Sequence, residues 1–109
     1  MRMGLARVHG RSMEPTLLAG DRLLLRYGAR VRPGALVVVR LPGRGVAVKR
    51  AWRRDGRGWW VERDNPMAGV DSWTLGPVPE KDILAVVVAR WWPRPSLLRA
   101  RPRRDRGPG

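Results

Sequence analysis

Apolar residues in this chain gather in short runs, and no long stretch shows the 3.6-residue spacing of an amphipathic helix. The runs have the length and aliphatic composition of strands, and they lie at residues 5–9, 22–26, 36–39, 46–53, 58–62 and 83–90. The run Leu36-Val37-Val38-Val39 contains no polar position, which predicts a strand buried on both faces. Asp55-Gly56 separates two of the runs and predicts a hairpin turn. Together these patterns predict a mostly β fold with little helix.

Turn-forming residues divide the chain between these runs. Pro15 and the pair Gly20-Asp21 predict a turn or short helix, and the polar, Gly- and Pro-punctuated residues 64–78 predict a long loop. Arg, Pro and Gly dominate residues 94–109, which predicts a disordered basic tail. We therefore expect one domain, residues 1–93, followed by this tail.

The formal net charge is +14, from 23 Lys and Arg residues against nine Asp and Glu. Such a charge suits a nucleic acid or an acidic protein substrate, but it is explained most simply by the arginine-rich composition of a GC-rich genome. The chain has no Cys and one His, and its carboxylates are scattered, so we expect no metal site and no cofactor.

The sequence also bears on location. No apolar run approaches the roughly 18 residues that a membrane helix needs, and the first residues lack the apolar stretch of a signal peptide. We therefore expect a soluble, cytoplasmic protein without a membrane anchor.

The basic residues are almost all arginine, and this makes Lys49, within the apolar run 46–53, unusual. A buried lysine can lose its proton and act as a general base, whereas arginine stays protonated. Ser12 lies 37 residues before it, between Gly10 and Pro15, where the chain turns and can expose a hydroxyl. Alone, such a serine is equally well explained as a turn or cap residue. With Lys49, it predicts a serine nucleophile and a lysine base.

Several short motifs, in this order, resemble those of the signal peptidase I family. They are Ser12-Met13-Glu14-Pro15-Thr16-Leu17, Gly20-Asp21, Lys49-Arg50, Asp64-Asn65 and Asp71-Ser72. The resemblance implies the folded antiparallel sheet core of these peptidases, and a serine endopeptidase with Ser12 as nucleophile and Lys49 as base. It also implies that the acids, the asparagine and the serine of the last two motifs are structural supports near the lysine: Asp64, Asn65, Asp71 and Ser72.

Three positions depart from the pattern of this family. Gly10 stands where many signal peptidases have a serine that helps to bind the oxyanion, so we expect the Ser12 backbone N–H to take this role, supported by Gly10 and Met13. Gly69 stands where the family often has a serine bonded to the lysine, and Trp73 where it often has an arginine. The group that orients Lys49 therefore stays open, with Ser72 as one candidate.

Within this family, the chain resembles most the peptidases that mature nickel-type superoxide dismutase. The resemblance rests on the short chain without an anchor, on Asp-Asn-Pro at 64–66 and on Gly-Pro-Val-Pro at 76–79. It implies removal of an N-terminal propeptide from a nickel superoxide dismutase precursor, with no nucleic acid required. Two alternatives stay open: a LexA-like self-cleaving peptidase domain, and a non-catalytic basic β module that binds nucleic acid.

Overall fold

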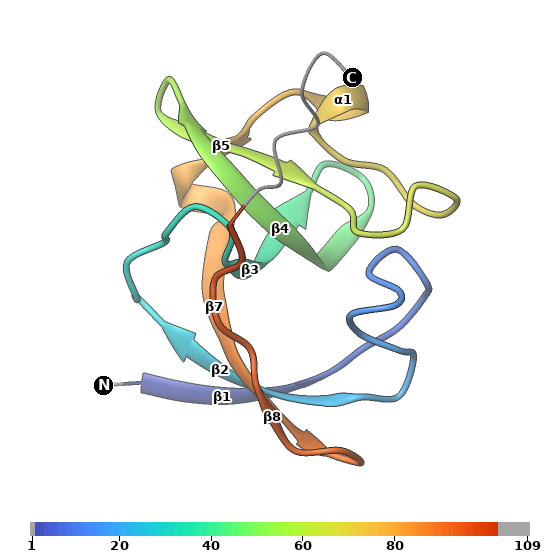
Figure 1. Cartoon of the computed structure of the whole chain (residues 1–109). Helices are drawn as coiled ribbons and strands as arrows, with labels where there is room; N and C mark the ends of the chain where they lie inside the picture. The colour runs from blue at the N-terminus through green and yellow to red at the C-terminus, as the bar shows by residue number, and fades with distance from the viewer. Residues whose placement is uncertain (1, 103–109) are drawn as a thin grey trace.

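A single antiparallel sheet forms most of the molecule (Figure 1). The computed structural model describes residues 2–102. Its strands are β1 (Arg2–Arg7), β2 (Arg22–Tyr27), β3 (Leu36–Leu41), β4 (Gly45–Asp55), β5 (Gly58–Glu62), β6 (Val78–Pro79), β7 (Ile83–Trp92) and β8 (Ser96–Leu97). The helical parts are α1 (Ser72–Leu75) and one 3-10 turn (Glu80–Asp82). The predicted mostly β fold with little helix is confirmed.

The order of the strands in the sheet is β1-β2-β7-β3-β4-β5-β6, and β8 pairs with β7. The predicted hairpin joins β4 and β5, where Asp55 lies opposite Gly58. β7 is inserted between β2 and β3, so strands far apart in the sequence become neighbours. The first strand covers Arg2–Arg7 rather than the predicted residues 5–9, because its pairing with β2 begins at Arg2 and ends at Arg7.

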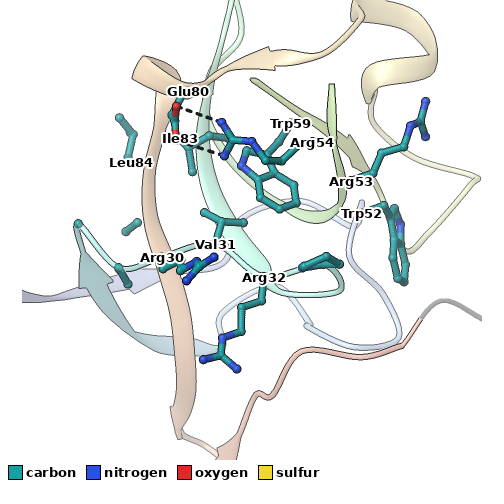
Figure 2. A pocket seen from close by; sticks show the side chains of 14 residues that line it. Arg30, Val31, Arg32, Trp52, Arg53, Arg54, Trp59, Glu80, Ile83 and Leu84 are labelled. Atoms are coloured by element: carbon teal, nitrogen blue, oxygen red, sulfur yellow. Dashed lines mark hydrogen bonds and ion pairs between the residues drawn. The ribbon is translucent and has the colours of Figure 1, made fainter. Parts of the chain in front are cut away.

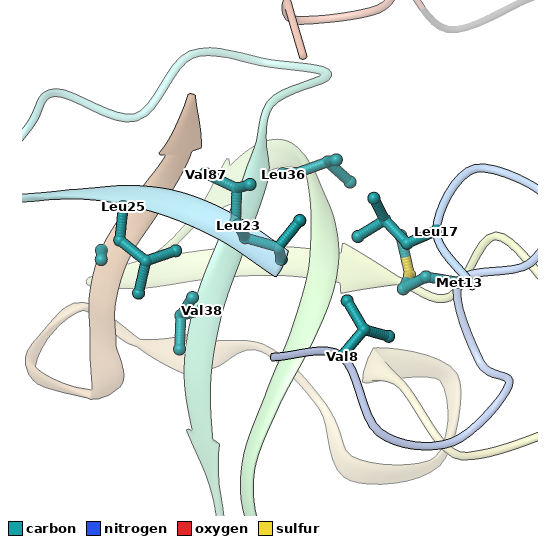
Figure 3. Close-up of a cluster of buried hydrophobic side chains, with 9 residues drawn as sticks. Val8, Met13, Leu17, Leu23, Leu25, Leu36, Val38 and Val87 are labelled. Carbon is teal, nitrogen blue, oxygen red and sulfur yellow. The ribbon is translucent and has the colours of Figure 1, made fainter. Parts of the chain in front are cut away.

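The central strand β3 separates two apolar clusters, as its unbroken apolar run predicts. Leu36 and Val38 point into one cluster, and Val37 and Val39 point into the other. Figure 3 shows the first cluster, where side chains from β2, β3 and β7 meet Met13 and Leu17 of the β1–β2 connection. This connection is therefore held to the sheet by its own buried side chains.

The predicted disordered tail needs a correction for residues 94–102. Ser96 and Leu97 form β8 against Arg90 and Ala89 of β7, and the Leu98 side chain packs against the first apolar cluster. Farther along, the Arg101 backbone N–H donates to the Gly34 carbonyl at 3.1 Å. The sequence reading overlooked the apolar pair Leu97-Leu98 within the basic composition. The remaining part of the predicted tail, 103–109, lies outside the described residues.

Within residues 2–102, no helix is long and apolar enough to cross a membrane.

Candidate active site

Ser12 lies in the β1–β2 connection, at a turn that buried neighbours hold in place. The next residue, Met13, is buried against the first apolar cluster, as is Leu17. Gly10 has φ of +79°, a left-handed conformation that a side chain would strain, and it lets the chain turn just before the serine. The serine is thus fixed at the surface while the residue after it points inward.

Lys49 lies near the middle of β4 and is only 2% exposed. Its Nζ is 3.2 Å from Ser12 Oγ, so the structure brings the two predicted residues into hydrogen-bond contact. Burial lowers the pKa of Lys49 from its ordinary value of 10.5, the Asp71 carboxylate partly opposes this, and the Arg63 guanidinium lowers the pKa further. Since a lysine base must be neutral, this environment favours the state that can accept a proton from the serine.

Residues 64–71, the segment after β5, lie beside Ser12 and form a wall of the site. The Asn65 backbone N–H donates to the Ser12 carbonyl at 2.8 Å, and the Asn65 side-chain amide donates to the Arg11 carbonyl at 2.8 Å. The Asp64 backbone N–H lies 3.4 Å from the Met13 sulfur. Asp64 and Asn65, predicted to be supports, therefore contact the segment that carries Ser12.

Gly69, in this wall, packs close to both Ser12 and Lys49. A Cβ placed there would lie 2.8 Å from Ser12 Cβ and 3.5 Å from Lys49 Nζ. Its φ is +78°, which also disfavours any side chain. The structure therefore has no room for a serine at position 69 beside the lysine.

A buried ion pair connects the lysine strand to the wall. The Arg50 guanidinium donates Nε to Asp64 Oδ1 at 3.0 Å and Nη2 to Oδ2 at 2.7 Å, and the Thr16 hydroxyl donates to Oδ2 at 2.6 Å. Burial by itself raises the pKa of Asp64, but the hydrogen bonds from Arg50 and Thr16, with the charges of Arg50 and Arg101, outweigh this and lower it. Asp64 therefore stays ionised within a buried network.

Asp71 and Ser72 have structural partners of their own. Asp71 caps α1, because its Oδ1 accepts from the Trp73 N–H at 3.0 Å, and its Oδ2 accepts from the Arg63 N–H at 3.1 Å. The Ser72 hydroxyl accepts from the Val61 N–H at 2.9 Å. Ser72 is thus engaged with β5, and the contact that Asp71 makes with the lysine is electrostatic.

A groove of about 120 Å³ leads to Ser12. It lies between β1 and the first half of β4, and its lining is small and mostly apolar: Ala6, Arg7, Val8, His9, Ser12, Met13, Val38, Val46, Ala47 and Val48. Pairing of β4 with β5 begins only at Arg50, so in the described part of the chain residues 45–49 pair with β3 alone. The groove therefore presents a free strand edge and an apolar floor to an extended peptide.

A larger pocket of about 880 Å³ shares no residue with this groove (Figure 2). Its one acid, Glu80, is bonded to Arg54, while Arg32 and Arg53 project away from the centre. Its basic side chains do not converge on one point. In residues 2–102 no group of three His, Cys, Asp or Glu side chains is placed to hold a metal ion.

Sequence reasoning named Arg50 only as part of the Lys49-Arg50 motif, without a role, and did not name Arg63; both make charge contacts in the site. Each lies next to a predicted residue, Lys49 and Asp64 respectively, in a chain where arginine is common. A signal was available for Arg50 alone, since an arginine within an apolar strand needs a buried acid.

A family model described as Peptidase S24-like matches residues 2–88. A search of the curated proteins finds no match.

Proposed function

Because the chain belongs to the Peptidase S24-like family, we propose that it is a serine endopeptidase with Ser12 as nucleophile and Lys49 as general base. The family supports a serine peptidase in general. The observation that carries the assignment of residues is the 3.2 Å separation of Lys49 Nζ and Ser12 Oγ, with the lysine buried. Nothing else among the described side chains offers Ser12 a base at hydrogen-bond distance.

The reaction has two halves. Neutral Lys49 takes the proton of the Ser12 hydroxyl while Oγ attacks the peptide carbonyl carbon, and the negative charge on the carbonyl oxygen is stabilised by the Ser12 backbone N–H. The Lys49 ammonium then gives its proton to the leaving amine as the C–N bond breaks, which leaves an acyl-enzyme. Lys49 next takes a proton from water, the hydroxide attacks the ester, and Ser12 recovers its proton from the lysine.

The substrate binds extended in the groove between β1 and β4. The free edge of residues 45–49 offers backbone hydrogen bonds, and the small lining side chains leave space for short aliphatic residues next to the cleaved bond.

The proposed substrate is the precursor of a nickel-type superoxide dismutase, cut once between propeptide and mature N-terminus. Support comes from the sequence resemblance at residues 64–66 and 76–79. The predicted cytoplasmic location and the independence from nucleic acid stay predictions.

The test combines variants with two substrates. Ser12→Ala and Lys49→Arg should each abolish cleavage, whereas Lys81→Arg, at the other lysine of the chain, should leave it unchanged. Mass spectrometry of the dismutase precursor should show one cut. An active Lys49→Arg enzyme would refute the lysine base, and an uncut precursor would refute the substrate.

The LexA-like alternative predicts a different result. Self-cleavage within one molecule proceeds at a rate that dilution does not change, and it leaves an added precursor intact. Loss of a fragment from the wild-type chain, but not from Ser12→Ala, would favour that alternative.

A further inference from the structure

The Arg63 side chain closes the segment that walls the proposed active site. Its Nη1 donates to the Gly69 carbonyl at 2.6 Å, and its Nη2 donates to the Pro66 carbonyl at 3.0 Å. At the same residue, the backbone N–H donates to Asp71 Oδ2. Arg63 therefore connects three residues of the segment 64–71 by hydrogen bonds: Pro66, Gly69 and Asp71.

The hydrogen bonds of Arg63 hold the surface of the wall that faces Ser12 and Lys49. Gly69 packs so closely that an added Cβ would overlap Ser12, and Lys49 Nζ lies just beyond. Glycine has no side chain with which to orient the lysine, and the hydroxyl of Ser72 is bonded to β5. The close packing of the wall backbone, to which Arg63 is bonded, therefore limits the space around Ser12 and Lys49.

The contacts of Arg63 depend on the shape of its guanidinium. Nη1 and Nη2 donate to two different carbonyls, and a forked, planar side chain makes both hydrogen bonds together. A methionine at this position would make neither.

We propose that Arg63 is the positioning residue of the Ser12–Lys49 pair, which it serves by holding the Gly69 and Pro66 carbonyls so that the wall fits against both groups. This inference rests on the proposed function of the pair. Arg63 is not among the residues that line the groove beside Ser12. The charge of Arg63 has a second effect: it lowers the pKa of Lys49. Asp71, at the other end of the segment, has the opposite effect and raises this pKa.

Three variants separate the geometry from the charge. Arg63→Lys keeps the charge but replaces the planar fork with a single nitrogen, Arg63→Gln keeps a donor without the charge, and Arg63→Met removes both. Arg54→Met is the matched control, since it also removes one positive charge, from an exposed ion pair with Glu80. All four are measured with the full chain.

Two readouts need no substrate. Selective ¹³Cε labelling of lysine gives two signals, Lys49 and the exposed Lys81, which serves as an internal reference. The pKa of Lys49 should rise in all three Arg63 variants, because a loosened wall admits water, and it should rise least in Arg63→Lys, which keeps the positive charge; it should not change in Arg54→Met. Hydrogen exchange of the Asn65 amide, which is bonded to the Ser12 carbonyl, should accelerate in all three Arg63 variants and not in the control.

The third readout is kinetic. All three Arg63 variants should lose about tenfold or more in kcat with little change in KM, because two charge-assisted hydrogen bonds that orient the pair are lost. The proposal would be overturned if Arg63→Met had the same kcat, the same exchange rate of the Asn65 amide and the same pKa of Lys49 as the wild-type protein. If the wild-type chain cleaves no peptide, the proposed function fails, while the exchange and titration experiments still decide whether Arg63 holds the wall.

Discussion

The buried pair Arg50–Asp64 should dominate the stability of the site. Both side chains are nearly inaccessible, at 3% and 6% exposure, and the guanidinium also donates to the Gly34 carbonyl at 2.8 Å. In Asp64→Asn the arginine keeps its charge but loses its counter-ion. Breaking a buried ion pair by removing one partner costs about 3–5 kcal/mol.

That cost is large for a domain of this size. Domains are stable by about 5–15 kcal/mol, so Asp64→Asn should remove roughly a fifth or more of the free energy of unfolding. It should lower the Tm by more than about 10 °C. The exposed pair Arg54–Glu80, at 54% and 63% exposure, provides the comparison, and Glu80→Gln should cost about 0–1 kcal/mol.

Urea unfolding followed by tryptophan fluorescence at neutral pH measures both variants. Arg50→Met and the double variant Arg50→Met/Asp64→Asn complete a cycle, in which the double variant should lose less stability than the two single variants added together. Because the pKa of Asp64 is lowered below 3.8, the stability from this pair is fully present above that pH and is lost as the pH falls through the lowered value. If Asp64→Asn costs no more than Glu80→Gln, the buried pair is not the stabilising element.

Three further results are expected. Peptidase activity should rise with pH and reach its plateau below pH 10.5, because Lys49 must be neutral and its pKa is lowered; activity that is still rising above pH 10.5, or that falls as the pH rises toward that value in a folded enzyme, would contradict the lysine base. Gly69→Ala should destabilise the fold by about 1 kcal/mol or more and reduce kcat, since the added Cβ meets Ser12 at a positive φ; unchanged thermal unfolding and kinetics would show that the wall can yield. Removal of residues 94–109 should lower the Tm, whereas removal of 103–109 should not, because β8 and Leu98 lie before the second cut; equal Tm values for the two truncations would refute a structural role of β8.

Much of the fold follows from local pattern. The runs at 22–26, 36–39, 58–62 and 83–90 all become strands, and the apolar run of β3 is buried on both sides. The order of the strands cannot be predicted from local pattern. It depends on β7 pairing with both β2 and β3, which lie far from it in the sequence. The error at residues 94–102 has a similar origin, since β8 is defined by its partner β7 rather than by its own two residues.

The site shows the same division between local chemistry and distant contacts. Lys49 stood out because lysine is rare in this arginine-rich chain, and Ser12 because of its motif and of Lys49; the structure places Lys49 Nζ and Ser12 Oγ 3.2 Å apart. The residues that surround them could not be inferred in this way. Arg63 and Arg50 resemble many other arginines until the chain folds and shows which carbonyl and which carboxylate each one meets.

In the proposed Ser12–Lys49 pair, Gly69 stands where a hydroxyl beside the lysine would otherwise lie. The close approach of its backbone to Ser12 leaves little space for water next to Lys49 Nζ, and loss of water is the main reason that the pKa of this lysine is lowered. A serine at this position would add a hydrogen bond but would also push the wall outward, because its Cβ could not fit. In the proposed site, Arg63 holds Gly69 in close packing against Ser12 and Lys49. This packing takes the place of a side-chain hydrogen bond to the lysine: it keeps Lys49 directed toward Ser12 and favours its neutral form.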